Sequence, residues 1–127
     1  VDLELAETDF GNAGIGAVAA MPQLVKLNLW LTQVDDQGVK SLAGKTNITS
    51  LNLDNIPAVT DASIDTILTL PDLTFLHLGK TSVSSEGIQR LTGLKKLEKL
   101  HVTNLGISDD VLQKLRDEMT ALKDLVN

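Results

Sequence analysis

The sequence contains two histidines, His77 and His101, separated by 24 residues. Two imidazoles on neighbouring strands could share a transition metal, with Asp54 or Glu4 as a third ligand. We expect Glu4 to lie several strands away from the pair and Asp54 to lie diagonally off it. The ligand set is then incomplete. The sequence therefore predicts no metal site and no cofactor, and His77 and His101 are the only metal candidates that it offers.

A nucleophilic triad is the second chemistry that the residue types allow. Ser50, His77 and Asp54 could supply its hydroxyl, imidazole and carboxylate. However, Ser50 and Asp54 are four residues apart, which is ~13 Å along one strand. That separation is too long for both side chains to bond one imidazole, and an open sheet provides no pocket for an oxyanion. We therefore expect no catalytic residues and a protein that is not an enzyme.

A regular period positions these side chains. Successive leucines follow one another at steps of 24, 24, 25 and 24 residues, and each has another aliphatic residue two positions later. This alternation predicts a strand with one buried face. Later in each period the apolar residues step by three, which predicts a short helix. The leucines are Leu3, Leu27, Leu51, Leu76 and Leu100, and the helical triplets are Ile15/Val18/Met21, Ile64/Ile67/Leu70 and Ile88/Leu91/Leu94.

Polar residues between strand and helix predict helix N-caps, because their side chains can accept bonds from free N–H groups. Small residues follow them, where we expect adjacent repeats to approach most closely. The predicted caps are Asp35–Asp36, Thr60–Asp61, Ser84–Ser85 and Ser108–Asp109. The small residues are Gly14, Gly38, Ser63 and Gly87, and the fifth repeat departs from the pattern with Val111.

The repeats divide one domain into the segments 1–23, 24–47, 48–72, 73–96 and 97–127. The last segment is predicted to end in a capping helix that runs through Met119, Leu122 and Leu125. The chain begins inside a repeat, at Val1. We therefore expect it to be part of a longer protein whose N-terminal sheet edge is covered by upstream repeats or by a second chain.

The pattern L-x-x-L-x-L-x-x-T-x-V-x-D-x-G-V-x-x-L resembles the leucine-rich repeat family, and most closely its 24-residue bacterial variant, common in planctomycetes. Thr8, Thr32 and Thr81 occupy the column where many members carry Asn or Cys, whereas Ile56 and Leu105 depart from it. The resemblance implies an α/β right-handed solenoid, or horseshoe. It also implies a parallel sheet on the concave face, short helices on the convex face, and protein binding.

Composition narrows the possible partners. Eleven basic residues stand against 17 acidic ones, giving a net charge of −6, so the chain lacks the positive footprint of a nucleic-acid binder. No apolar run approaches the ~20 residues that span a bilayer. The absence of Cys does not reveal the compartment; the resemblance favours an extracytoplasmic location in a bacterium.

The strand residues that face away from the helices form the predicted binding surface. Trp30 and Phe75 are expected as anchors, because aromatic residues are enriched in binding hot spots. Charge is graded along this face, from the acidic Asp2, Glu4 and Glu7 to a basic far end. We predict a recognition module for a protein or peptide ligand, or alternatively a structural spacer or accessory domain of a larger exported protein or enzyme. The predicted contact residues are Lys26, Asn28, Trp30, Asn52, Asp54, Phe75, His77, Lys99 and His101; the basic residues are Lys80, Lys95, Lys96, Lys99 and His101.

Overall fold

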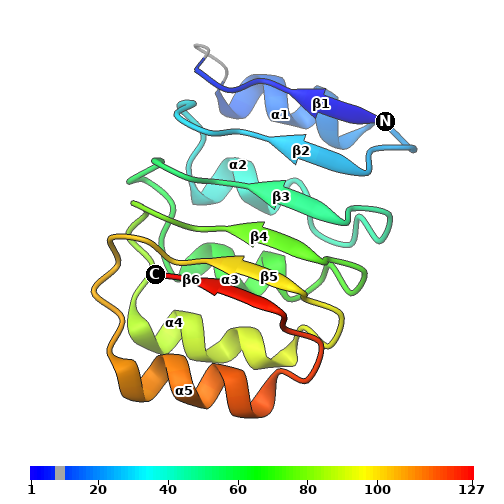
Figure 1. Cartoon of the computed structure of the whole chain (residues 1–127). Coiled ribbons are helices and arrows are strands. Elements are labelled where there is room, and N and C mark those ends of the chain that lie inside the picture. Colours follow the sequence, from blue (N-terminus) through cyan, green and yellow to red (C-terminus); the bar gives the residue numbers. More distant parts are fainter. Residues whose placement is uncertain (8–10) are drawn as a thin grey trace.

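The chain forms an α/β structure in which short strands and short helices alternate. The computed structural model describes residues 1–7 and 11–127 (Figure 1). Six strands lie parallel in one sheet, in the order of the sequence. The elements are β1 (Asp2–Glu4), α1 (Asn12–Ala19), β2 (Lys26–Asn28), α2 (Asp36–Lys40), β3 (Ser50–Asn52), α3 (Ala62–Ile67), β4 (Phe75–His77), α4 (Ser85–Arg90), a 3₁₀ turn η1 (Leu91–Gly93), β5 (Lys99–His101), α5 (Asp109–Glu118) and β6 (Asp124–Val126).

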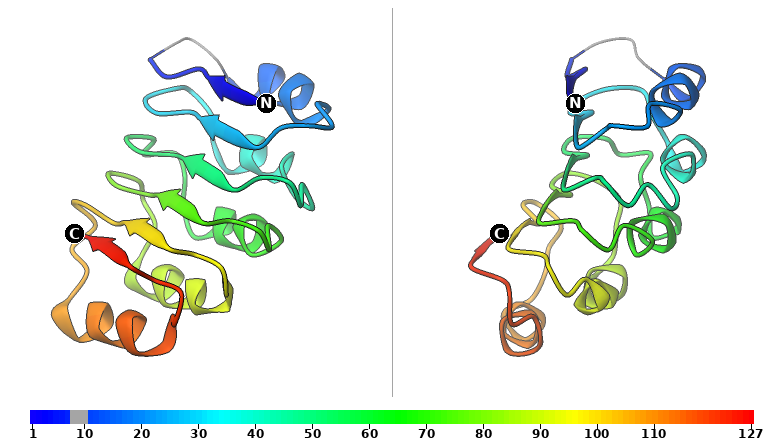
Figure 2. Two further views of the ribbon diagram at one scale, coloured as in Figure 1. Left: turned by 45° about the vertical axis from the view of Figure 1, so that its right-hand side comes forward. Right: turned by 90° about the vertical axis from the view of Figure 1, so that its right-hand side faces the viewer.

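Strands and helices form two layers, seen edge-on in Figure 2. The middle residue of each strand points toward the helices and enters the core: Leu27, Leu51, Leu76 and Leu100 are at most 1% exposed. The residues on either side of it point the opposite way, because successive strand side chains alternate. We call that opposite side, which no helix covers, the open sheet face.

Hydrogen bonds between repeats organise the starts of the helices. The Asp36 carboxylate accepts bonds from the N–H and hydroxyl of Thr60 and from the hydroxyl of Ser63. Asp61 likewise accepts from the N–H and hydroxyl of Ser84 in the next repeat. Asn12 accepts from the N–H of Asp35 through its Oδ1, and its Nδ2 donates to the Asp35 carboxylate. A residue at the start of one helix therefore hydrogen-bonds to the N-cap region of the helix in the next repeat.

This arrangement explains the small residues. A Cβ built on Gly38 would overlap the Asn12 side chain, and one built on Gly87 would overlap the Asp61 carboxylate. The predicted close approach is confirmed at both glycines. In the fifth repeat Val111 takes this position, and in the repeat before it Ser85 takes the position of Asp61.

Three of the predicted caps bond their own helices. Asp35 accepts from the N–H groups of Gln37 and Gly38, Ser84 from that of Gly87, and Ser108 from that of Val111. In α3 the Asp61 side chain makes no such bond, because it turns to the next repeat. The Thr60 hydroxyl accepts instead from the N–H of Ala62, at 3.3 Å.

The prediction of a capping helix through Leu125 is wrong. α5 ends at Glu118, and the chain returns to form β6, in which Leu125 is in register with Leu100. The N–H of Lys123 donates to the carbonyl of Glu98 at 2.7 Å. The segment forms a strand in place of the predicted helix because strand pairing satisfies backbone groups along β5 that would otherwise remain unpaired. The leucine period continues here with one more step of 25 residues.

Smaller differences concern the ends of the predicted helices: Leu70 lies beyond α3 and Leu94 beyond η1, although both are buried. Met21 was expected in a buried helical stripe, but α1 ends at Ala19 and Met21 is 39% exposed. Ile15 and Val18 are buried as predicted. Thr8, assigned to the threonine column, lies outside the described residues. Thr32 and Thr81 donate their hydroxyls to the carbonyls of Leu29 and Leu78 within their own repeats.

A left-handed residue follows each of the first five strands. These five residues have φ between 55° and 61°, although none is glycine. Asn adopts this conformation at little cost, whereas other L-residues are strained by it. The five are Glu7, Leu31, Asn55, Lys80 and Asn104. Across residues 1–7 and 11–127, no helix is long and apolar enough to cross a membrane.

Candidate functional site

Two columns of side chains cover the open sheet face, and strand pairing fixes their order. Each residue is in register with the next in its column, so neighbours lie one strand spacing apart, ~4.8 Å. The columns are Asp2, Lys26, Ser50, Phe75, Lys99 and Asp124, and Glu4, Asn28, Asn52, His77, His101 and Val126.

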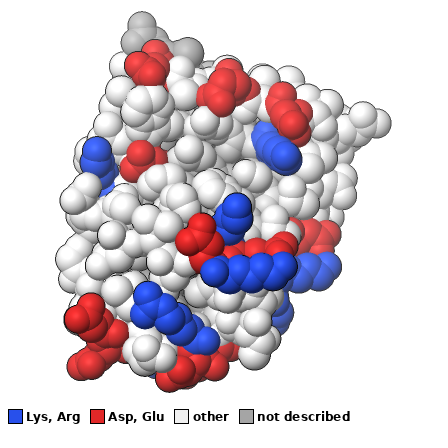
Figure 3. All heavy atoms as spheres, in the orientation of Figure 1, with Lys and Arg blue, Asp and Glu red and all other residues white. Residues whose placement is uncertain are grey.

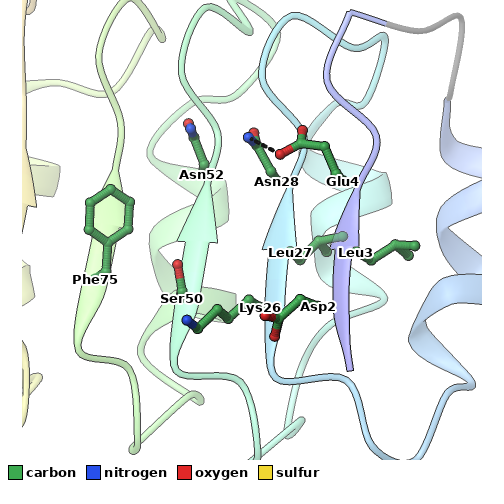
Figure 4. Close-up of a pocket in the computed structure, with 9 residues that line it drawn as sticks. All are labelled: Asp2, Leu3, Glu4, Lys26, Leu27, Asn28, Ser50, Asn52 and Phe75. Atoms are coloured by element: carbon green, nitrogen blue, oxygen red, sulfur yellow. Dashed lines mark hydrogen bonds between the residues drawn. The ribbon is translucent and has the colours of Figure 1, made fainter.

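Two adjoining hollows lie over these columns. Hollow A, of ≈ 320 Å³, spans β1 to β4 (Figure 4). Hollow B, of ≈ 390 Å³, lies over the beginnings of the later strands. Hollow A is lined by Asp2, Leu3, Glu4, Lys26, Leu27, Asn28, Ser50, Asn52 and Phe75, and hollow B by Lys26, Thr49, Ser50, Thr74, Phe75, Glu98, Lys99 and Lys123.

Phe75 is the aromatic residue that both hollows share. Its half-buried side chain lies on β4, next to the small Ser50 of β3. The Lys26 side chain extends from β2 toward Ser50 (Figure 4). Because Ser50 is short, the surface between the Phe75 ring and the Lys26 stem is left open. A ligand there would meet an apolar wall and a cation together.

Side chains of the second column also have a structural role that the sequence did not predict. Each of its first four members accepts a bond from the backbone N–H two residues later. These pairs are Glu4 with Ala6, Asn28 with Trp30, Asn52 with Asp54, and His77 with Gly79, at 2.9–3.1 Å. Asn28 also donates to Glu4 at 2.9 Å. Polar acceptors here end the strands, so their presence alone does not indicate a ligand.

The two histidines lie together beside Phe75. The rings of His77 and His101 have centroids 4.7 Å apart, and those of Phe75 and His101 are 5.4 Å apart, both edge-on. Asp54 lies closer than we expected, with its Oδ2 3.9 Å from His77 Nε2. Gly79 explains the approach. A Cβ at that position would overlap Thr103 Oγ1 and lie 2.8 Å from both Asp54 Oδ1 and His77 Cε1.

The tautomer of His77 follows from its contacts. Nδ1 accepts from the N–H of Gly79, so a neutral ring carries its proton on Nε2, which faces Asp54. Burial lowers the pKa of His77 from its usual 6.5; His101 and Lys80 lower it further, and Asp54 opposes them. Asp54 Oδ1 is buried without a hydrogen-bond partner in the described part of the chain.

Within the described ranges, no group of three or more His, Cys, Asp or Glu side chains is arranged to hold a metal ion. The nucleophile of the triad considered above would be Ser50. Its strand partner is Phe75, whereas the strand partner of His77 is Asn52, two positions further along β3. Ser50 instead lines the hollows.

The charge gradient along the open sheet face is weaker than the sequence predicted. Acidic side chains gather over β1, but both signs mix over the later strands (Figure 3). Lys96 pairs with Asp72, and Lys123 pairs with Glu98, which lowers the pKa of that glutamate. Asp124 stands in register with Lys99. The prediction missed Asp124 and Lys123 because it placed their segment in a helix.

The structure brings most of the predicted contact residues together. Five of them line the hollows, namely Lys26, Asn28, Asn52, Phe75 and Lys99. Asp54, His77 and His101 line neither hollow but form the cluster beside Phe75. Trp30 is half-buried just after β2 and belongs to neither set. Four residues just before the strands line hollow B and were not among the predicted contact residues. They recur with the leucine period, which was the available signal: Thr49, Thr74, Glu98 and Lys123.

A scan against protein-family models and a search of curated protein sequences found no match to this chain.

Proposed function

We propose that this protein is a leucine-rich-repeat solenoid that recognises a segment of another polypeptide on its open sheet face and catalyses no reaction. The observation that carries the proposal is Phe75, an aromatic side chain shared by two adjoining hollows on the face that the helices leave uncovered. Aromatic residues surrounded by polar contacts are typical anchors of protein interfaces. The pattern of the sequence and the parallel six-stranded sheet support the repeat class.

The geometry of the face suits an extended chain. Its two columns are shallow and run across at least five strands, which spans ~19 Å at the usual strand spacing. An extended peptide of about six residues covers that length. The small Ser50 leaves room beside Phe75 for one apolar side chain of such a peptide.

Selection from a random dodecapeptide library tests the proposal. Peptides selected on the wild-type chain are titrated against Phe75→Ala and against Met21→Ala. Met21 is an exposed apolar residue that lines neither hollow. We expect Phe75→Ala to weaken binding at least about ten-fold, as at a hot spot, and Met21→Ala to leave it unchanged.

Selected peptides that bind Phe75→Ala as tightly as wild type would contradict the proposal. Failure to select any peptide would favour the spacer or accessory role instead. Circular dichroism of each variant establishes that loss of binding does not reflect loss of folding.

A further inference from the structure

The charges around the two hollows differ in sign. Hollow B has three lysines against one glutamate in its lining, whereas hollow A has two acidic residues against one lysine. The whole chain carries −6, so the lining of hollow B is a local positive surplus on an acidic protein. From this we infer that the polypeptide bound at the open sheet face is acidic, with a carboxylate in hollow B and an apolar side chain against Phe75.

This inference rests on the proposed function and names the chemistry of its partner. Lys26 and Lys99 carry it, since neither takes part in an ion pair within the described residues. Lys123 contributes less, because its amine is held by Glu98 at 2.7 Å. Two unpaired cations on either side of one aromatic ring match a ligand that is anionic and apolar at once.

Spacing within the ligand follows from strand pairing. Lys99 is in register with Phe75, so its column position lies about 4.8 Å from that of the ring. One residue of extended peptide covers about 3.3 Å. The ligand's carboxylate therefore lies one or two residues from its apolar side chain. The opposite end of the ligand lies over Asp2 and Glu4 in hollow A, where a basic residue fits.

The same charges argue against a nucleic acid in this place. A polyanion would have to pass Asp2 and Glu4 at one end and Asp124 at the other, on a chain of net negative charge. Such binders need several uncompensated cations along the path of the phosphates. Hollow B offers only Lys26 and Lys99 without an ion-pair partner among the residues described.

Titrations followed by amide chemical shifts test the inference. The probes are three octapeptides that share one Leu and carry, one and two residues after it, either two Glu, two Gln or two Lys. A thymidine octanucleotide is the fourth probe. We expect the Glu peptide to bind most tightly and to shift the amides of Ser50, Phe75 and Lys99. Its affinity should fall as salt is raised, because exposed charges are screened.

Charge variants assign the effect to hollow B. We expect Lys99→Glu to lower the affinity for the Glu peptide about five-fold, the usual scale of one exposed charge contact. The Glu peptide should then bind no more tightly than the Gln peptide. Asp124→Asn should raise the affinity for the Glu peptide. Lys40→Glu makes the same charge change on an exposed residue of α2 and should have no effect.

The outcomes separate this inference from the proposed function. If the Glu and Gln peptides bind equally and both are lost with Phe75→Ala, the charge inference is overturned and recognition at the open face stands. If the oligonucleotide shifts the same amides more strongly than any peptide, the acidic-peptide partner is overturned. If no probe shifts these amides, and the library selection also yields no peptide that depends on Phe75, both proposals fail.

Discussion

Asp36 of the second repeat accepts hydrogen bonds from both the N–H and the hydroxyl of Thr60 in the third, at 2.8 and 2.5 Å. The Ser63 hydroxyl donates to the same carboxylate at 2.6 Å. One side chain thus satisfies three donors on the neighbouring repeat. Charged acceptors make stronger hydrogen bonds than neutral ones. Neighbouring repeats are therefore held together by polar contacts at the helix starts as well as by the leucine core.

We predict that Asp36→Ala destabilises the fold by about 1–3 kcal/mol, because three donors lose their charged acceptor. Asp65→Ala is the control. Asp65 forms an exposed ion pair with Arg90, and its side chain is 73% exposed, so the loss should be about 0.5 kcal/mol or less. Urea unfolding of both variants at pH 7 measures the difference. Equal losses would show that the Asp36 bonds contribute no more than a surface pair.

Acid should weaken the same contact. Hydrogen bonds from Ser63 and Thr60 lower the pKa of Asp36 from 3.8, although burial, the largest single influence, opposes them. A lowered carboxyl pKa means that the unfolded chain binds the proton first. The stabilisation is therefore complete above pH 3.8 and is lost as pH falls through the lower folded value. Wild type should lose more stability than Asp36→Asn between pH 5 and pH 3 in urea titrations.

The sequence predicted those elements that a repeating hydrophobic pattern determines. All five leucine positions became central strand residues, and Gly38 and Gly87 lie where the preceding repeat intrudes. The sixth strand was missed because apolar residues spaced by three, such as Leu122 and Leu125, fit a helix as well as a returning strand. Pairing with β5 decides between them, and such a long-range contact is absent from a local pattern.

The binding surface was predicted only in part. Register placed Lys26, Phe75 and Lys99 correctly, because one period fixes every strand neighbour. The hollows depend on side-chain length, as at Ser50, and on charges brought in by the misassigned segment around Asp124. Those details arise only once the side chains are packed.

Gly79 is predicted to resist substitution. A Cβ there would overlap Thr103 Oγ1 and crowd Asp54 and His77, so Gly79→Ala should cost about 1–3 kcal/mol. Gly16→Ala is the control, because nothing lies within 4 Å of its Cβ position on α1, and it should stabilise the protein by about 0.5–1 kcal/mol. Combining Gly79→Ala with Asp54→Ala should recover part of the loss if crowding is the cause. A tolerated Gly79→Ala would show that the cluster relaxes freely.

Leu31 is predicted to be a site of avoidable strain. Its φ is 56° and the residue stays 43% exposed, so burial of its side chain offsets the backbone strain only in part. Leu31→Asn should raise the free energy of unfolding by about 0.5–1 kcal/mol, since Asn tolerates the left-handed region. Asn55, at the equivalent position with φ 61°, provides the reverse test: Asn55→Leu should cost a similar amount. Changes of the same sign in both variants would rule out backbone strain as the cause.

His77 should make stability depend on pH near neutrality. Burial, together with the charges of His101 and Lys80, lowers its pKa from 6.5, so the unfolded chain takes up the proton more readily than the folded one. The free energy of unfolding should therefore fall as pH is lowered from about 7.5 toward 5.5. His77→Asn should reduce that slope, and at pH 8 its stability should stay close to wild type. Asn52 already accepts the N–H two residues later at 2.9 Å, as His77 does for Gly79, so the substituted amide can keep the strand end intact. Urea titrations at four pH values measure the slope. An unchanged slope in His77→Asn would exclude His77 as its source.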